Sequence, residues 1–398
     1  MSTRSIVSPD DQKVTFVELF FDLVFVFSVT QLVRLLHHGM DAAALGQTIL
    51  VFWLVWWGWT QFTWALNAAD TTHHLVELAT LLATAVAFFM AVGVPDAFAG
   101  GALRFAVPYV VVRVLGLMVY GWVAEAAGAA QHAAVRRFCY FSSAGLVAVL
   151  AGAAIGGTAQ YWIWALAILL DIVAAAVGGA DEHWNLHPDH FAERHALFVI
   201  IALGETLIVA ATGITGAQWS AQLITLVVLA VANTCALWWS YFTRAKPVLD
   251  DALAAAHGAR QSTMARDVFS LLHFPMLCGV IAYAAAIEEA VAHPDGPFTA
   301  AARLALAAGL ALFLGAMALA IWRAQRLLLR ARLMLAFATA LAILVLPRMA
   351  PATMLAIAFA GIAAMCVWEQ VFASLEPAHR AAAHASARAE AEHHVHSH

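Results

Sequence analysis

The first apolar run of the sequence, residues 14–36, is long enough to cross a lipid bilayer and yet carries two carboxylates. A membrane-spanning helix needs about 20 consecutive, mostly apolar residues. Glu18 and Asp22 are four residues apart, so a helix places both side chains on the same face. A charge near the centre of a bilayer costs at least ~2.5–3.5 kcal/mol. The run therefore predicts a membrane helix whose two acids form either a helix-packing pair or a functional polar site, and we favour the functional site.

The composition extends this prediction to the whole chain. Hydrophobic residues make up 63% of the 398 residues, and charged residues make up only 11%. Soluble domains contain about 45–50% apolar and about 25% charged residues. We therefore expect an all-α polytopic membrane protein. The net charge of −5 is spread over few charged residues and gives no indication of nucleic-acid binding. The four cysteines stand singly in apolar runs, which predicts neither disulfides nor a zinc site.

The distribution of basic residues predicts the topology. With a cytoplasmic N-terminus, most Arg and Lys residues fall on the cytoplasmic side, among them Arg136, Arg194 and Arg266. An odd number of spans would scramble this division, so we expect about twelve spans with both termini in the cytoplasm. The predicted spans are residues 14–36, 45–66, 75–94, 102–124, 135–155, 159–178, 196–214, 219–242, 269–288, 298–322, 333–346 and 351–372.

Comparison of the chain with itself indicates an internal duplication. W-W-G-W at residues 56–59 matches W-W-S-Y at residues 238–241, an offset of 182, and Asp22 matches Glu205 at an offset of 183. Parallel repeats of this kind recur in transporters, with substrate sites where the repeats meet. Further along, an offset of 199 pairs His74 with His273, Pro95 with Pro294 and Arg104 with Arg303.

These collinear matches predict two six-helix repeats inserted in the same orientation, residues 1–180 and residues 181–374. Residues 375–398 form a His-rich segment that we expect to be a disordered cytoplasmic tail.

Four charged residues are predicted to lie at a similar depth in the membrane: Asp22, Arg113, Asp171 and Glu205. Pairing the arginine with one acid leaves an excess of negative charge. A water-filled or cation-lined path would account for that excess, and so would an ion-pair network with protonated acids. We predict that Asp22 and Glu205 lie close together near the centre and that Arg113 reaches one acid of this layer.

The segment before the seventh span contains several histidines. His183, His187 and His190 with Glu193 resemble a set of metal ligands, but no accepted zinc spacing fits and a proline interrupts the helix. We therefore expect no metal and no cofactor. His190, Glu193 and Arg194 are predicted to form a hydrogen-bonded cluster at the cytoplasmic mouth. His273 is a further candidate at the mouth and is expected to be a packed, hydrogen-bonded histidine.

Three motifs together resemble the low temperature requirement A family of bacterial membrane proteins. They are V-E-L-F-F-D-L-V-F-V-F-S-V-T-Q-L, H-F-A-E-R-H-A-L-F-V-I-I-A-L-G-E-T and H-F-P-M-L-C-G-V-I. The resemblance implies an integral membrane protein and does not bring a defined activity. The positions that carry it are Glu18, Phe21, Asp22, His190, Glu193, Arg194, Gly204, Glu205, His273 and Gly279.

A looser similarity concerns the bacterial and lysosomal potassium-channel family whose six-span repeats carry R-x-x-x-F-S-D. F-F-D-L-V-F at residues 20–25 echoes F-S-D, and R-H-A-L-F at residues 194–198 echoes R-x-x-x-F. Phe21 replaces the serine, and no arginine stands four residues before Phe20. This similarity implies a six-span repeat architecture without implying potassium selectivity.

We favour a transporter or channel that moves a cation or a proton-coupled small solute between the two repeats. Glu18, Asp22 and Glu205 would bind or relay the ion, with Arg113 and Asp171 as the supporting charges. One alternative is a membrane-embedded enzyme that acts on a lipid or isoprenoid and uses His190, Glu193 and His273 as acid–base groups. Another is a non-catalytic scaffold or sensor. The expected partners are the lipid bilayer, a small ion or solute and a second copy in a homodimer.

Overall fold

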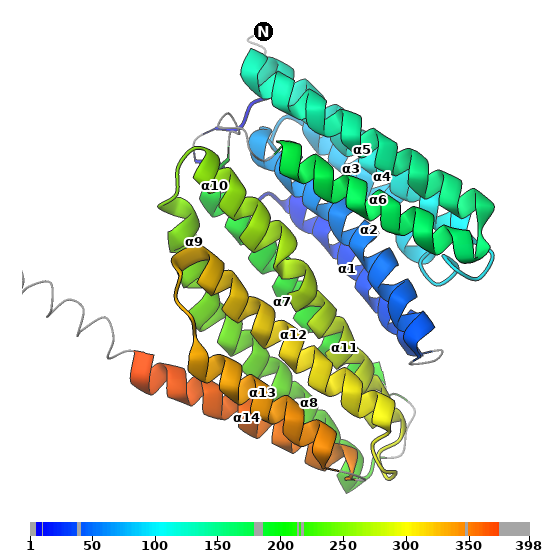
Figure 1. The fold of residues 1–398 in the computed structure, drawn as a ribbon, viewed down its shortest axis with the longest axis vertical. Coiled ribbons are helices and arrows are strands. Elements are labelled where there is room, and N and C mark those ends of the chain that lie inside the picture. Colours follow the sequence, from blue (N-terminus) through cyan, green and yellow to red (C-terminus); the bar gives the residue numbers. More distant parts are fainter. Residues whose placement is uncertain are drawn as a thin grey trace, which may run out of the picture.

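The computed structural model describes residues 5–9, 11–37, 41–178, 186–212, 215, 219–346 and 349–373. Within these residues every element is a helix, as Figure 1 shows. The predicted all-α membrane fold is confirmed. His183 and the tail at residues 375–398 lie outside the described residues.

The helices are α1 (Phe16–His37), α2 (Ala42–Ala68), α3 (His74–Val92), α4 (Ala102–Ala127), α5 (Ala129–Ile155), α6 (Gly157–Gly178), α7 (Pro188–Thr212), α8 (Ala221–Ser240), η1 (Tyr241–Ala245), α9 (Lys246–Ala254), α10 (Ala259–Met264), η2 (Ala265–Leu271), α11 (His273–Ala292), α12 (Ala300–Gln325), α13 (Arg330–Val345) and α14 (Pro351–Ala373).

Eleven helical stretches in the described part of the chain are long and apolar enough to span a membrane. Two of them are longer than expected, because the π-helical segments η1 and η2 join their neighbours into continuous stretches, Ala221–Ala254 and Ala259–Ala292. The predicted span at residues 333–346 corresponds to α13, which has 16 residues. At 1.5 Å per residue α13 is about 24 Å long, somewhat shorter than the ~30 Å hydrocarbon core.

The helices form two groups, α1–α6 and α7–α14, which lie side by side in Figure 1. The same order of neighbours recurs in both groups. In the first, α1 packs on α2 and α3, α4 packs on α3 and α5, and α6 packs on α2 and α5; in the second, α7, α8, α11, α12, α13 and α14 repeat this pattern. Both α3 and α11 begin at the histidines that the internal comparison pairs, His74 and His273. This packing is consistent with a six-plus-six repeat, which stays a prediction together with the topology.

The two groups meet where α1 and α2 face α7 and α11. Helices α1 and α7 run in the same direction, because Asp22 contacts Arg194 and Thr30, farther along α1, contacts Glu205, farther along α7. The contacting residues are 172 and 175 positions apart. The predicted proximity of Asp22 and Glu205 is therefore wrong. Asp22 and Thr30 are eight residues apart, about 12 Å along the helix.

Close glycine packing joins α11 to α12. A Cβ atom built on Gly279 would lie 2.6 Å from the carbonyl oxygen of Gly309 and 2.6 Å from the backbone nitrogen of Phe313. Small residues allow membrane helices to approach closely and so gain van der Waals contact. The glycine of the third family motif is therefore a packing residue between two helices.

We expect Gly279→Ala to lower the unfolding temperature of the purified protein. The added methyl group meets backbone atoms, which cannot move aside as a flexible side chain can, and overpacking of this kind costs ~1–3 kcal/mol. Gly315→Ala, on the same helix pair, is the control, because a Cβ atom there has open space around it. An unfolding temperature of Gly279→Ala equal to that of the control would contradict this account.

Candidate functional site

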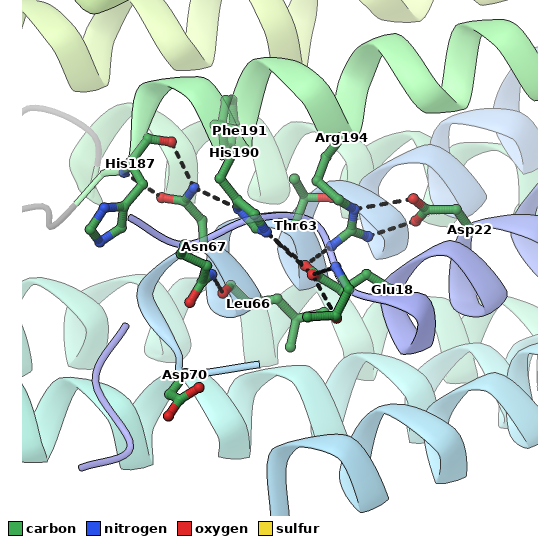
Figure 2. Close-up of polar contacts among 12 residues, drawn as sticks. Glu18, Asp22, Thr63, Leu66, Asn67, Asp70, His187, His190, Phe191 and Arg194 are labelled. Atoms are coloured by element: carbon green, nitrogen blue, oxygen red, sulfur yellow. Dashed lines mark hydrogen bonds and ion pairs between the residues drawn. The ribbon is translucent and has the colours of Figure 1, made fainter. Parts of the chain in front are cut away.

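Arg194 of α7 pairs with both carboxylates of the first apolar run. Its Nη1 donates to Glu18 Oε1 at 2.6 Å, its Nη2 to Asp22 Oδ1 at 2.6 Å and its Nε to Asp22 Oδ2 at 3.1 Å. Figure 2 shows the guanidinium between the two acids. All three residues are fully buried. One guanidinium of α7 therefore reaches both carboxylates, because their four-residue spacing places them on the same face of α1.

Other donors complete the coordination of the two carboxylates. Asp22 Oδ1 accepts a hydrogen bond from Trp59 Nε1 of α2 at 2.6 Å. Glu18 Oε2 accepts from the backbone nitrogen and the hydroxyl of Thr15, both at 2.9 Å. The guanidinium carbon of Arg194 also lies 5.8 Å from the centre of the Trp59 ring, within range of a cation–π contact. The acids of α1 are therefore held by groups from two other helices, α2 and α7, and by the segment before α1.

The tautomer of His190, that is, which ring nitrogen carries the proton, is indicated by its contact with Asn67 at the end of α2. The Asn67 amide is oriented by the backbone of His187, whose N–H donates to Oδ1 and whose carbonyl accepts from Nδ2, each at 2.9 Å. Nδ2 then donates to His190 Nδ1 at 3.0 Å. In this arrangement Nδ1 accepts the hydrogen bond, which corresponds to the tautomer with its proton on Nε2. His190 Nε2 then donates to Glu18 Oε2 at 3.3 Å and lies 3.0 Å from Oε1 (Figure 2).

The charges of this cluster do not cancel. With both acids ionised and the His190 ring in this tautomer, the cluster has two negative charges, on Glu18 and Asp22, against the one positive charge of Arg194. Trp59 and Asn67 add hydrogen bonds but no charge. A buried charge without a counter-charge is expensive and is usually removed by a bound proton or ion. The cluster of Glu18, Asp22, His190 and Arg194, which we call the carboxylate cluster, then has one negative charge in excess.

A second buried network lies within the first helix group. Arg113 of α4 pairs with Asp171 of α6, with Nη2 at 2.9 Å from Oδ1 and Nη1 at 3.3 Å from Oδ2. Arg113 also donates to Tyr109 and Ser142, both at 2.5 Å, and to the Gln61 side chain. The expectation that Arg113 reaches an acid is met. This pair is balanced in charge, so it supports the helix packing and has no obvious capacity for an additional ion.

The remaining predicted site residues are dispersed. Glu205 is half-buried and accepts a hydrogen bond from Thr30 at 2.6 Å, about two turns from Asp22 along α1. Glu193 is exposed and lines a separate cavity with Asp189 and Lys246. The prediction that Glu193 joins His190 and Arg194 in one cluster is therefore wrong, because adjacent residues of a helix face different directions.

Arg194 differs from the expectation of a residue at the mouth, and His273 agrees with the expectation of a packed histidine. Arg194 lies inside α7, whose first residue is Pro188, and does not lie at a mouth. The predicted span begins at residue 196, eight residues after the observed start of α7, so the prediction placed Arg194 outside the helix. His273, at the first position of α11, contacts the Tyr241 hydroxyl through Nε2 and the Val268 carbonyl through Nδ1, each at 2.9 Å. It is the packed, hydrogen-bonded histidine that the sequence predicts.

Sequence reasoning missed Trp59 and Asn67 as members of the site. Trp59 belongs to the W-W-G-W run at residues 56–59, and nothing in its position points to an acid on another helix. Asn67 stands out only as an amide at the end of an apolar run. Both contacts depend on the packing of α2 against α1 and α7, which the sequence does not reveal.

The comparisons with known proteins agree with this architecture. The family described as bacterial low temperature requirement A protein (LtrA) matches residues 13–368, which include all the motif residues above. The chain belongs to this family. This LtrA protein is accordingly a multipass membrane protein, and in it the two acids of α1 contact the arginine of α7. A curated relative is an uncharacterized protein of Rhizobium meliloti, 27% identical over 72% of this chain and 71% of its own length. No solved structure matches.

Proposed function

We propose that this LtrA protein is a proton-coupled transporter of a small solute in the bacterial cytoplasmic membrane. The observation that supports this proposal is the uncompensated charge of the carboxylate cluster at the junction of the two helix groups. Two acids and one arginine are fully buried there, and the fourth member, His190, contacts the Asn67 amide through Nδ1. A cluster used only for packing would be expected to balance its charges, as Arg113 and Asp171 do.

Protonation of one acid would change how tightly the two helix groups are held together. Arg194 makes three hydrogen bonds to Glu18 and Asp22, and all of them cross from α7 to α1. A protonated carboxyl group interacts more weakly with a guanidinium than a carboxylate does. Proton binding would therefore weaken this contact, and proton release would restore it. A local charge change that biases two packing states is the usual basis of a switch.

The enzyme alternative has less support in this arrangement. It requires His190, Glu193 and His273 to act together as acid–base groups. His190 donates to Glu18 in the carboxylate cluster, Glu193 is exposed, and His273 is hydrogen-bonded to Tyr241. These three side chains have separate surroundings, so they offer no common position for a reacting group.

Uptake into proteoliposomes tests the proposal. The vesicles have an acidic exterior and contain a pH indicator. Potassium, amines, sugars and organic acids are added outside. Uptake of the organic solutes is measured by mass spectrometry, and uptake of potassium is measured with a potassium indicator. We expect at least one solute to enter faster than into protein-free vesicles, with proton entry, and to stop when an ionophore collapses the pH gradient. Equal uptake with and without protein, or potassium entry that is independent of the gradient, would overturn the proposal.

A further inference from the structure

A groove of about 380 Å³ lies at the junction of the two helix groups, at the end of the bundle where α2 and α12 begin (Figure 1). Its volume lies within the range of small-molecule sites, about 300–1,000 Å³. Helices α1 and α2 supply one wall, and helices α11 and α12 supply the other. A molecule in the groove would therefore contact both helix groups at once.

The groove follows the helices over a length that resembles one bilayer leaflet. On α2 its lining extends from Ala42 to Phe52, and on α12 it extends from Ala301 to Leu312. At 1.5 Å per residue these distances are about 15–17 Å, close to half of the ~30 Å hydrocarbon core. Both helices are long and apolar enough to span a membrane. The groove therefore enters the membrane from one surface and has about the length of one leaflet.

An aromatic contact closes the inner end of the groove, and its side is open to the bilayer. Phe52 lines the inner end, and its ring stacks on that of Phe274 of α11 with 5.1 Å between the ring centres. Leu45 of α2 and Leu304 of α12 line the groove and are exposed. Because these leucines belong to membrane-spanning helices, the groove is continuous with the lipid-facing surface of the protein.

Water is a poor occupant of this groove. Its described lining is apolar except for Asp41, Thr48 and the Cys278 thiol. The Thr48 hydroxyl donates to the Ala44 carbonyl, and Asp41 Oδ1 accepts from the Ala44 backbone nitrogen, each at 2.8 Å. A buried water needs two to four polar partners, which these walls do not offer. An empty groove would leave its walls without van der Waals partners, so hydrocarbon is the occupant that fits.

The width of the groove excludes a helix as its occupant. A volume of about 380 Å³ over a length of about 15 Å corresponds to a cross-section of ~25 Å². An α-helix with its side chains is about 10–12 Å in diameter, which is a cross-section of at least ~80 Å². Neither a helix of a partner protein nor a helix of a second copy would enter the groove, whereas a single hydrocarbon chain would.

The charge at the membrane-surface end of the groove is negative. Among the described residues that line the groove, Asp41 is the one with a charge, and it is exposed at the start of α2. Its carboxylate disfavours the anionic headgroup of a free fatty acid or of phosphatidylglycerol. An ammonium group can instead donate a charge-assisted hydrogen bond to it. The charge therefore favours a phospholipid with an amine headgroup.

We propose that the groove binds one phosphatidylethanolamine molecule of the surrounding bilayer, with an acyl chain along the groove and the ammonium group at Asp41. The chain would contact α2 of one helix group and α12 of the other, so the lipid would contribute to the packing at their junction. This site does not depend on transport. A failure of the proposed function would leave the proposal about the lipid unchanged.

Native mass spectrometry of the purified protein measures the binding of single lipid molecules. We expect one phosphatidylethanolamine to bind more tightly than those that follow it, and more tightly than phosphatidylglycerol or palmitate. Asp41→Asn should lower the preference for phosphatidylethanolamine over phosphatidylglycerol by ~2–5-fold, the range of an exposed ion pair. Asparagine caps a helix about as well as aspartate does, so this variant keeps the start of α2.

Ala305→Phe should remove the tight site, because Ala305 lines the groove and the larger side chain would occupy it. Ala311→Phe is the matched control, because Ala311 is an exposed residue of the same helix that does not line the groove. It should bind phosphatidylethanolamine as the wild-type protein does.

Photolabelling of the wild-type protein tests the site without any variant, should Ala305→Phe fail to fold. Phosphatidylethanolamine with a photoreactive acyl chain is added to nanodiscs, and the labelled residues are identified by mass spectrometry. We expect residues 42–52 and 301–312 to be labelled more than the exposed Val147 of α5, and unlabelled phosphatidylethanolamine to compete only in the groove. Equal labelling of the groove and Val147, an unchanged tight site in Ala305→Phe, an equal loss in Ala311→Phe, or tighter binding of phosphatidylglycerol or palmitate would overturn the proposal.

Discussion

Asp22→Asn is expected to yield a folded protein that has lost proton-coupled uptake. The substitution removes one of the two negative charges, so Glu18 and Arg194 balance each other and the cluster no longer takes up a proton. The side-chain oxygen of asparagine still accepts the hydrogen bond from Trp59 Nε1, which keeps the local packing. Because a buried uncompensated charge is costly, the unfolding temperature should be equal to or above that of the wild-type protein.

Two measurements on the same preparation separate function from folding in this variant. Uptake is measured in proteoliposomes, and the unfolding temperature is measured in detergent micelles. Glu193→Gln is the matched control, because it removes an exposed acid next to Arg194 in sequence that does not belong to the cluster. Uptake at the wild-type rate in Asp22→Asn would overturn the coupling role. A parallel loss of uptake and of stability would instead favour a purely structural role for the acid.

Arg194→Met is expected to have the largest effect on stability. It leaves Glu18 and Asp22 buried together without a counter-charge, and removal of one partner from a buried ion pair costs ~3–5 kcal/mol. The loss should be larger here than for Arg113→Met, which leaves the single acid Asp171 unpaired. We expect little folded protein in the membrane fraction and a strongly lowered unfolding temperature in what remains.

Removing the acids should rescue the arginine variant. In the combination of Glu18→Gln, Asp22→Asn and Arg194→Met, no charge of the cluster remains, so most of the lost stability should return. This non-additivity is the signature of residues that interact directly. Arg136→Met, at an exposed position of α5, controls for the general loss of a positive charge. If the combined variant is no more stable than Arg194→Met, the cost does not arise from unpaired acids.

The sequence by itself determined the class of the fold. In a bilayer each backbone polar group must be satisfied within the chain, so an apolar run of sufficient length becomes a helix whatever its neighbours are. This is why the predicted runs correspond closely to the observed helices, with the short α13 as the least certain case. The four-residue spacing of Glu18 and Asp22 likewise placed both acids on one face without any tertiary information.

The tertiary structure alone decided which charges meet. When one of two parallel helices is shifted by two turns along the other, the pattern of apolar residues on their facing sides changes little. For this reason the internal comparison of this alanine-rich and leucine-rich chain paired Asp22 with Glu205 and gave no information on the register between α1 and α7. The packing of α1 on α7 instead brings Asp22 to Arg194, 172 residues away, and Glu205 to Thr30. Ion pairs act over a few ångströms, so a shift of ~12 Å changes the partner completely. Local sequence therefore determined which residues are buried charges, and only the register between helices determined their partners.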